Sequence, residues 1–311
     1  MHHPCPRGLT EAGTERGPTM AAQSDFAPSR VDKARHQDGY YPFESSNEER
    51  LRLMTQAELL APLTKRLLKK ARIGSGMRVL DIGSGSGDVS LLAAGLVGPE
   101  GSVVGVDSDP AQVEFAERRA KAERWGNVSF MVADYREVVL TPPVDAIVGR
   151  LVLMYAPEPL AALRCTLRNL RSGGVIVLQE SVTDYDAPVL VEPPDCLAGR
   201  VVEWFRAGFK HAGVQPRLGL RLFGLLKAAG LDCSTEIDMS VPIQQGPQGE
   251  LFRTLTSVVR SQLSAIVASG AATESEIDIE TLEQRLIADA PPVGVVGYFN
   301  FGHVGIWARK P

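Results

Sequence analysis

The chain of 311 residues is long enough for one α/β domain with insertions or for two small domains. Its formal charge of −4 lacks the basic excess that neutralises several phosphates, so we expect no nucleic-acid partner. No apolar run reaches the roughly 18 residues of a membrane span, and residues 1–20 carry no apolar core of a secretory signal. We therefore expect a cytoplasmic protein without membrane contact.

The four cysteines, Cys5, Cys165, Cys196 and Cys233, lie far apart and form no C-x-x-C pair. The histidines include no H-x₃-H pair. These spacings predict reduced thiols and no metal site.

Residues 1–38 are rich in Gly, Pro, Ser, Thr and charge, which predicts a disordered extension. Met20 could be the natural start of translation. An ordered segment is expected over 39–74. There Ser45 and Ser46 are each followed three residues later by a glutamate, the capping-box pattern of a helix start. Pro62 predicts a break, and hence two helices.

From Met77 onward, short apolar runs alternate with helical segments. The predicted strands are 78–82, 102–107, 128–132, 146–149 and 175–179. The predicted helices between them are 88–96, 111–122 and 160–170. Asp109 followed by Pro110 is a typical helix start, with the aspartate as N-cap. This alternation predicts a parallel, doubly wound sheet.

After Glu180 the pattern changes. We expect helices over 196–212 and 217–229, strands over 234–241 and 303–309, and a long helical stretch over 247–301. A connection of that length is typical of a functional cap.

The predicted fold is therefore α/β, with a doubly wound, mostly parallel, seven-stranded Rossmann-like sheet and helical cap insertions. The expected segments are a disordered extension (1–38), a helical lid (39–74), a cofactor-binding core (75–186), a first helical insertion (187–216), a continuation of the core (217–242), a second helical insertion (243–301) and a final core strand (302–311).

A glycine-rich segment from Asp81 to Gly87 follows the first predicted strand and precedes a helix. Gly83, Gly85 and Gly87 allow the backbone to turn sharply and a ligand to approach without a Cβ in the way. The helix start beyond the loop offers free N–H groups. Asp88 stands where a dinucleotide fingerprint has its third glycine, and its carboxylate would repel a pyrophosphate. A nicotinamide-dependent dehydrogenase is therefore a remote alternative.

Two further carboxylates follow neighbouring strands. Asp107 ends the second strand, where an acidic side chain can accept both hydrogen bonds of a ribose diol. Asp134 follows the third strand, where a carboxylate can accept from an adenine amine. Because the carboxyl ends of parallel strands meet at one edge of the sheet, these residues are expected to share a ligand with the glycine loop.

Residues Asp81 to Gly87, Asp107 and Asp134 resemble, in order and spacing, the first three motifs of the class I S-adenosylmethionine-dependent methyltransferases. The resemblance covers residues 75–180 well. A second set of residues resembles the small-molecule branch with a ubiquinone/menaquinone-methyltransferase-like core: Arg150–Tyr155, Pro157, Leu160, Leu163, Leu170, Gly173-Gly174 and Gln179-Glu180. The resemblance implies S-adenosylmethionine as cofactor and S-adenosylhomocysteine as product.

The resemblance also implies roles for single residues. The loop residues Gly83, Ser84, Gly85 and Gly87 would lie against the methionine part, and Asp81 would position its amino group. The ribose would bind at Asp107 and Ser108, and the adenine at Ala133, Asp134 and Tyr135. Arg150 would lie under the methionine tail, and Tyr155 would face the substrate.

The acceptor side is less defined. A base is needed only where the nucleophile must lose a proton, and the candidates are Glu180, His211, His303 and Tyr40 or Tyr41. His303 could instead be a core residue, and His211 a solvated helix residue. Tyr40 and Tyr41 could be packing residues or a lid over the sulfonium. Gln56 could reach the cofactor carboxylate or occupy the surface.

Aromatic residues of the insertions could line an apolar pocket or belong to the core. They are Trp204, Phe205, Phe209, Phe299 and Phe301.

The sequence thus predicts methyl transfer to an O, N or C atom of a small, apolar metabolite of the secondary-metabolite type. Methylation-coupled cyclisation or binding without transfer is the alternative use of the same cofactor site. The aromatic-rich N-terminal segment could pack against another copy, which leaves a homo-oligomer open.

Overall fold

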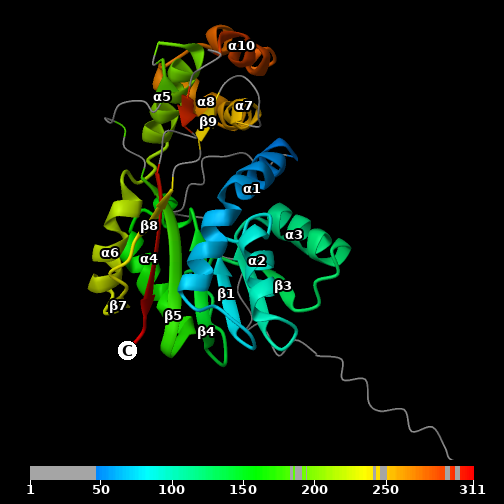
Figure 1. Ribbon diagram of the computed structural model, residues 1–311, viewed down its shortest axis with the longest axis vertical. Coiled ribbons are helices and arrows are strands. Elements are labelled where there is room, and N and C mark those ends of the chain that lie inside the picture. The colour runs from blue at the N-terminus through cyan, green and yellow to red at the C-terminus, as the bar shows by residue number, and fades with distance from the viewer. Residues whose placement is uncertain are drawn as a thin grey trace, which may run out of the picture. The chain divides into compact units, whose positions relative to one another are not determined.

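The centre of the protein, seen in a computed structural model, is a sheet of eight described strands in the order β3-β2-β1-β4-β5-β11-β7, with β8 beside β7 on β11 (Figure 1). The structure describes residues 47–182, 185, 191–193, 195–240, 243–245, 251–290, 295–297 and 302–311. The strands of this sheet are β1 (Arg78–Ile82), β2 (Ser102–Asp107), β3 (Val128–Val132), β4 (Val144–Arg150), β5 (Leu170–Val182), β7 (Asp232–Cys233), β8 (Asp238–Ser240) and β11 (Gly302–Arg309).

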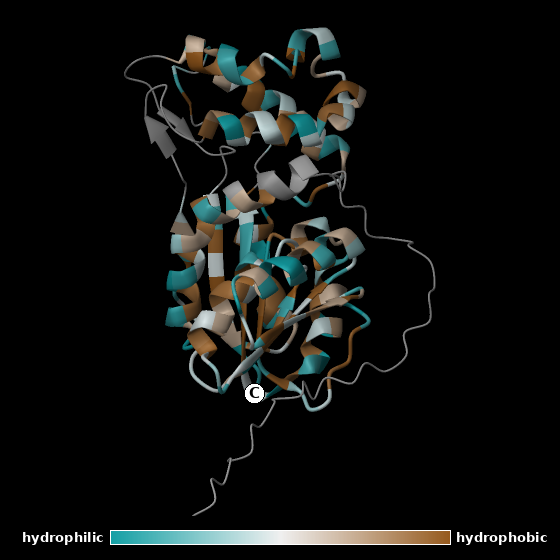
Figure 2. Cartoon of the chain, turned by 90° about the vertical axis from the view of Figure 1, so that its right-hand side faces the viewer, coloured by the Kyte–Doolittle hydropathy of each residue, from teal (hydrophilic) through white to brown (hydrophobic). Residues whose placement is uncertain are grey.

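β1 to β5 run parallel, and β11 is antiparallel to β5, β7 and β8. The predicted α/β fold with a mostly parallel, doubly wound sheet is therefore confirmed. In detail, the strand expected over 234–241 is split into β7 and β8, so the last position of a seven-position sheet is shared by two short strands. The central strands are mostly hydrophobic between their polar ends (Figure 2), because both faces of the sheet are covered by helices.

Helices α1 (Asn47–Lys70), α2 (Asp88–Val97) and α3 (Pro110–Ala122) cover one face of the sheet. The core under α1 and α2 includes Leu67, Val79, Val103 and Val148. Helices α4 (Pro159–Thr166) and α6 (Leu218–Ala228) pack together, and α6 lies on β5 and β11. Two 3₁₀ helices, η1 (Leu153–Tyr155) and η2 (Leu167–Asn169), flank α4.

The predicted start of α3 is confirmed, because the Ala111 N–H donates to the Asp109 side chain at 2.9 Å and Pro110 is the first helical residue. The predicted break at Pro62 is wrong, because α1 is one helix from residue 47 to 70. Pro62 is exposed and leaves the carbonyl of Glu58, also exposed, to be solvated. Leu60 and Leu63, both buried, anchor the helix on either side of it. The capping-box residues Ser45 and Ser46 lie outside the described residues.

The two segments predicted as separate insertions share structure. Helices α5 (Leu197–His211), α7 (Leu251–Ser261), α8 (Leu263–Ser269), α9 (Glu274–Ile277) and α10 (Leu282–Asp289) belong to them. α5 packs against α7, α8 and α10, and the Leu197 N–H at the start of α5 donates to the Asp289 carboxylate. α7 also contacts α1.

The stretch expected to be helical over 247–301 also contains a strand, β10 (Val295–Gly297). β10 pairs antiparallel with β6 (Val191–Glu192) and with β9 (Ile243–Gln245) in a second, three-stranded sheet. The prediction was wrong here because strands of two or three residues carry too little periodicity to be recognised. In the described part of the chain, no helix combines the length and apolarity needed to cross a membrane.

The contact between α1 and the sheet depends on a glycine. A Cβ on Gly305 of β11 would lie 2.6 Å from Cδ2 of Leu67, which is 1% exposed and would have to shift within the core. Gly305→Ala should therefore lower the free energy of unfolding by roughly 1–3 kcal/mol through overpacking. Urea titration measures this change.

Gly224→Ala is the matched control, because Gly224 lies on the exposed side of α6 with nothing within 4 Å of its Cβ position. It should stabilise the protein by up to about 1 kcal/mol, the helix preference of Ala over Gly. Equal stability of the Gly305→Ala variant and the wild-type protein would show that the α1 contact is not tight.

Candidate active site

The loop between β1 and α2 has the conformation for which its glycines were singled out. Gly83, Gly85 and Gly87 have φ of 59°, 50° and 84°, in the left-handed region that favours glycine. A Cβ on Gly83 would lie 2.6 Å from the Val152 side chain, and one on Gly87 would lie 2.8 Å from Phe130. Larger residues are therefore excluded by strain and by close packing.

Asp107, at the carboxyl end of β2, holds the middle of this loop. Its carboxylate accepts from the Gly85 N–H at 2.8 Å and from the Asp109 N–H at 3.0 Å. Burial raises the pKa of Asp107, while these backbone hydrogen bonds lower it. The neighbouring Ser108 is exposed. The structure thus brings Asp107 and the glycine loop together.

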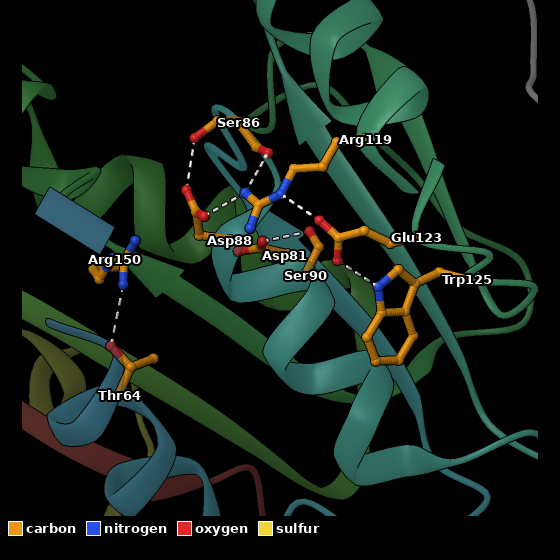
Figure 3. Close-up of polar contacts among 9 residues, drawn as sticks. All are labelled: Thr64, Asp81, Ser86, Asp88, Ser90, Arg119, Glu123, Trp125 and Arg150. Carbon is orange, nitrogen blue, oxygen red and sulfur yellow. Dashed lines mark hydrogen bonds and ion pairs between the residues drawn. The ribbon is translucent and has the colours of Figure 1, made fainter. Parts of the chain in front are cut away.

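Asp81 lies deeper, in β1, and is buried. The Ser90 hydroxyl of α2 donates to its carboxylate at 2.6 Å (Figure 3). Burial raises the pKa of Asp81 to about 7, against the opposing effects of the Ser90 hydrogen bond and the Arg150 charge. Asp81 therefore sits beneath the loop, linked to the first turn of α2.

Asp134, after β3, is paired with a residue that the sequence reasoning missed. The Arg136 backbone N–H donates to it at 2.8 Å and the guanidinium Nη2 at 2.6 Å. The sequence signal that could have revealed this pair is the position of Arg136, a cation two residues after the candidate carboxylate Asp134. The Ala133 N–H donates to the Asp107 carbonyl at 2.9 Å, which joins the ends of β2 and β3. Tyr135 is partly buried, and burial raises its pKa.

Arg150 ends β4 beneath α1. Its Nη1 donates to the Thr64 hydroxyl at 3.3 Å, and that hydroxyl donates to Gln179 Oε1 at 2.7 Å. Thr64 was not predicted, because nothing in its local sequence distinguishes it from other helix residues. Gln56, also on α1, is buried, so the surface alternative for it is wrong.

Glu180 is fully buried at the carboxyl half of β5. Its Oε1 accepts from the backbone N–H groups of Val152 at 3.0 Å and Leu153 at 2.8 Å, and its Oε2 has no partner among the described residues. Burial raises the pKa of Glu180 to about 7, although these N–H groups favour the charged form. Glu180 thus positions the chain after β4, where Val152 packs on Gly83. Its role as a base stays a prediction.

The remaining candidates are spread over the molecule. His211 is exposed at the end of α5, whereas His303 is buried in β11, and burial lowers the pKa of His303 to about 3. Tyr155 lies partly buried in η1. Some of the remaining predicted aromatic residues are buried in α5, where the rings of Phe205 and Phe209 meet edge to face. The rest lie outside the described part of the chain. The buried ones are Trp204, Phe205 and Phe209. The others are Tyr40, Tyr41, Phe299 and Phe301.

Asp88 corrects one argument from the sequence. Its carboxylate forms an ion pair with Arg119 and accepts from the Ser86 hydroxyl at 2.6 Å. It therefore presents no unpaired charge to a ligand, and repulsion of a pyrophosphate is not the reason to exclude a dinucleotide. The absence of the third glycine of the dinucleotide fingerprint is still an argument against a dinucleotide.

Part of the chain is similar to known methyltransferases. A family model described as a methyltransferase domain matches residues 73–209. Arsenite methyltransferase of Halobacterium salinarum is 34% identical over 133 residues, which are 42% of this chain and 34% of that protein. Aklanonic acid methyltransferase DauC of a Streptomyces species is 32% identical over 130 residues, 40% of this chain and 57% of that protein.

An uncharacterised protein of Mycobacterium tuberculosis is 32% identical over 209 residues, 63% of this chain and 73% of that protein. The crystal structure of the YcgJ protein from Bacillus subtilis has the same fold, with a TM-score of 0.51 at 18% identity, over 82% of this chain and 99% of that one.

The chain spans 34% of the arsenite methyltransferase and 57% of DauC, so these two alignments each cover part of a protein. Together with the glycine loop and the strand-end carboxylates, the matches show that residues 73–209 form a methyltransferase domain of the class I S-adenosylmethionine-dependent type. The dehydrogenase alternative is thereby set aside. The cofactor and the reaction of the whole protein are taken up as a proposal below.

The raised pKa of Glu180 gives a pH-dependent stability. Because the folded-state pKa of about 7 lies above the ordinary 4.5, the folded protein binds the proton more tightly, and stability falls as pH rises through this interval. The loss is on the order of 3 kcal/mol. Glu180→Gln keeps an oxygen acceptor for the two N–H groups but cannot ionise, so its stability relative to the wild-type protein should rise between pH 5 and pH 8.

Urea unfolding at the two pH values measures the difference. Asp81 is present in both proteins, so its own titration cancels. Glu158→Gln, at an exposed position, is the control and should show no such trend. A Glu180→Gln difference that does not change with pH would contradict the burial of a carboxylate charge.

Proposed function

We propose that this enzyme transfers the methyl group of S-adenosylmethionine to an O, N or C atom of a small, apolar metabolite. The observation that carries the proposal is the contact between Asp107 and the Gly85 N–H, which puts a carboxylate and a glycine loop at adjoining strand ends. The cofactor supplies a methyl group on a sulfonium sulfur. The protein must align an acceptor atom with that carbon and exclude water.

In this proposal the cofactor lies across the carboxyl ends of β1 to β4. Asp107 would accept from the ribose hydroxyls, with Ser108 beside it. Asp81, Gly83, Ser84, Gly85 and Gly87 would surround the methionine part, and the Ser84 hydroxyl supports this because it is buried without a partner in the described part of the chain.

The segment Ala133-Asp134-Tyr135 would receive the adenine. Gln56 on α1 and Arg150 at the end of β4, beneath α1, would face the methionine carboxylate. Opposite charges attract most strongly where water is scarce, and Arg150 is partly buried.

We also propose that the segments 187–216 and 243–301 together form a cap that encloses the substrate. They share a three-stranded sheet and a core that includes Phe205, Phe252 and Ile266, all fully buried. α7 contacts α1, the helix that carries Thr64 and Gln56. A cap with an apolar core suits a small metabolite better than a macromolecular surface. The names of two relatives, which refer to arsenite and aklanonic acid, also support a small substrate.

Binding of S-adenosylhomocysteine tests the cofactor site by calorimetry. Asp107→Asn retains the shape of the side chain but loses the charge that the ribose hydroxyls would face. We expect the Kd to rise about 10- to 100-fold, because a hydrogen bond to a charged group contributes roughly 1.5–3 kcal/mol. Glu114→Gln, an exposed carboxylate on α3, should leave the Kd unchanged. Equal affinity of the Asp107→Asn and wild-type proteins would place the ribose elsewhere.

The acceptor class is tested with S-adenosylmethionine that carries a labelled methyl group. The protein is incubated with separated small-molecule, protein and RNA fractions of a cell extract, and each fraction is then counted. We expect label in the organic-soluble small molecules. Label in protein or RNA would contradict the proposed substrate class. Absence of label from every fraction, with intact cofactor binding, would favour a non-transferring use of the site.

A further inference from the structure

Arg119 of α3 contacts the C-terminal half of the glycine loop (Figure 3). Its Nη1 forms the ion pair with Asp88 and also donates to the Ser86 carbonyl at 3.4 Å. The side chains of Arg119 and Asp88 are 24% and 12% exposed, so this pair is better shielded from water than a surface ion pair. It joins the first residue of α2 to a helix that follows the next strand.

The other side of the guanidinium is anchored as well. Arg119 Nε donates to Glu123 at 3.0 Å, and Glu123 accepts from the Trp125 indole N–H, also at 3.0 Å. The Trp125 ring lies against α2, where a Cβ on Gly95 would be 3.4 Å from it. The chain of contacts thus begins at the loop, crosses α3 and returns to α2. Arg119 is fixed in place by both helices.

The two halves of the loop are held by different elements. The N-terminal half is held by β2, because the Ser84 N–H donates to the Val106 carbonyl at 3.0 Å and the Gly85 N–H donates to Asp107. The C-terminal half contains Ser86 and Gly87, and here the contact to the Ser86 carbonyl comes from Arg119. Glycines at positive φ give this segment many alternative conformations, which a bound ligand would have to restrict.

We propose that Arg119 is a positioning residue for the cofactor. Without touching the cofactor, it holds Ser86 and Asp88 so that the loop is already in its binding conformation. This inference rests on the proposed placement of the methionine part against the loop. The inference predicts a selective effect. The affinity for ligands with the amino-acid tail depends on Arg119, whereas the affinity for adenosine, which would contact Asp107 and the end of β3, does not.

The test compares Arg119→Gln with Arg118→Gln, a neighbour on the same helix whose exposed side chain pairs with Glu114. The Kd of S-adenosylhomocysteine is measured by calorimetry, and that of adenosine by competition. We expect Arg119→Gln to weaken S-adenosylhomocysteine binding about tenfold and adenosine binding less than about threefold, because only the tail side loses a preorganised loop. Arg118→Gln should match the wild-type protein for both ligands.

Asp88→Asn removes the same ion pair from its other end. If Arg119 acts through Asp88, the double variant should bind S-adenosylhomocysteine about as weakly as the weaker single variant. Effects that simply multiply would overturn the inference. So would equal losses for both ligands accompanied by a lower midpoint of urea unfolding, since they would indicate a merely structural role.

The outcomes also separate this inference from the proposed site. If Asp107→Asn weakens S-adenosylhomocysteine binding and Arg119→Gln does not, the proposed cofactor site is supported and the positioning role of Arg119 is overturned. If the wild-type protein fails to bind S-adenosylhomocysteine, the proposed site itself is overturned.

Discussion

The hydrogen bond from the Gly85 N–H to the Asp107 carboxylate ties the loop after β1 to the end of β2, and the site is built around it. A loop with three glycines at positive φ has no rigidity of its own. The neighbouring strand supplies it, through Asp107 and the Val106 carbonyl. The same carboxylate is the group proposed to hold the ribose. Support of the loop and recognition of the ligand therefore depend on one side chain.

The carboxyl-end halves of the central strands also carry ionisable side chains, of which Asp81 and Glu180 are buried and Arg150 is partly buried. Asp81, Arg150 and Glu180 lie within or beneath a layer that would otherwise be apolar, and burial raises the pKa of both carboxyls. Such groups cost stability unless hydrogen bonds and opposite charges compensate for lost hydration. Here Ser90 and the N–H groups after β4 compensate in part. This is the expected arrangement where a site requires fixed polar groups at the expense of stability.

The sequence was sufficient for the core because its signals are local. The first three strands match their predicted bounds, and Asp109 and Pro110 start α3 as expected. The meeting of Asp107 with the glycine loop also followed, since parallel strands end at one edge. Contacts between helices could not be predicted, because helical periodicity identifies a buried face but not its partner. Arg119 and Thr64 were missed for this reason, and Pro62 was misjudged because tertiary packing keeps α1 continuous.

The pairing of β6 with β10 affects how the chain can fold during synthesis. Val191 is made about a hundred residues before its partner Val296, and contacts so distant in sequence form slowly. β5 likewise pairs with β11, which is made more than a hundred residues later. Until β11 has been made, β5 is an open sheet edge on which another chain could pair. The parallel strands β1 to β5 can assemble early. Residues 295–309 then complete both sheets, so the proposed cap can exist only after this segment has been made.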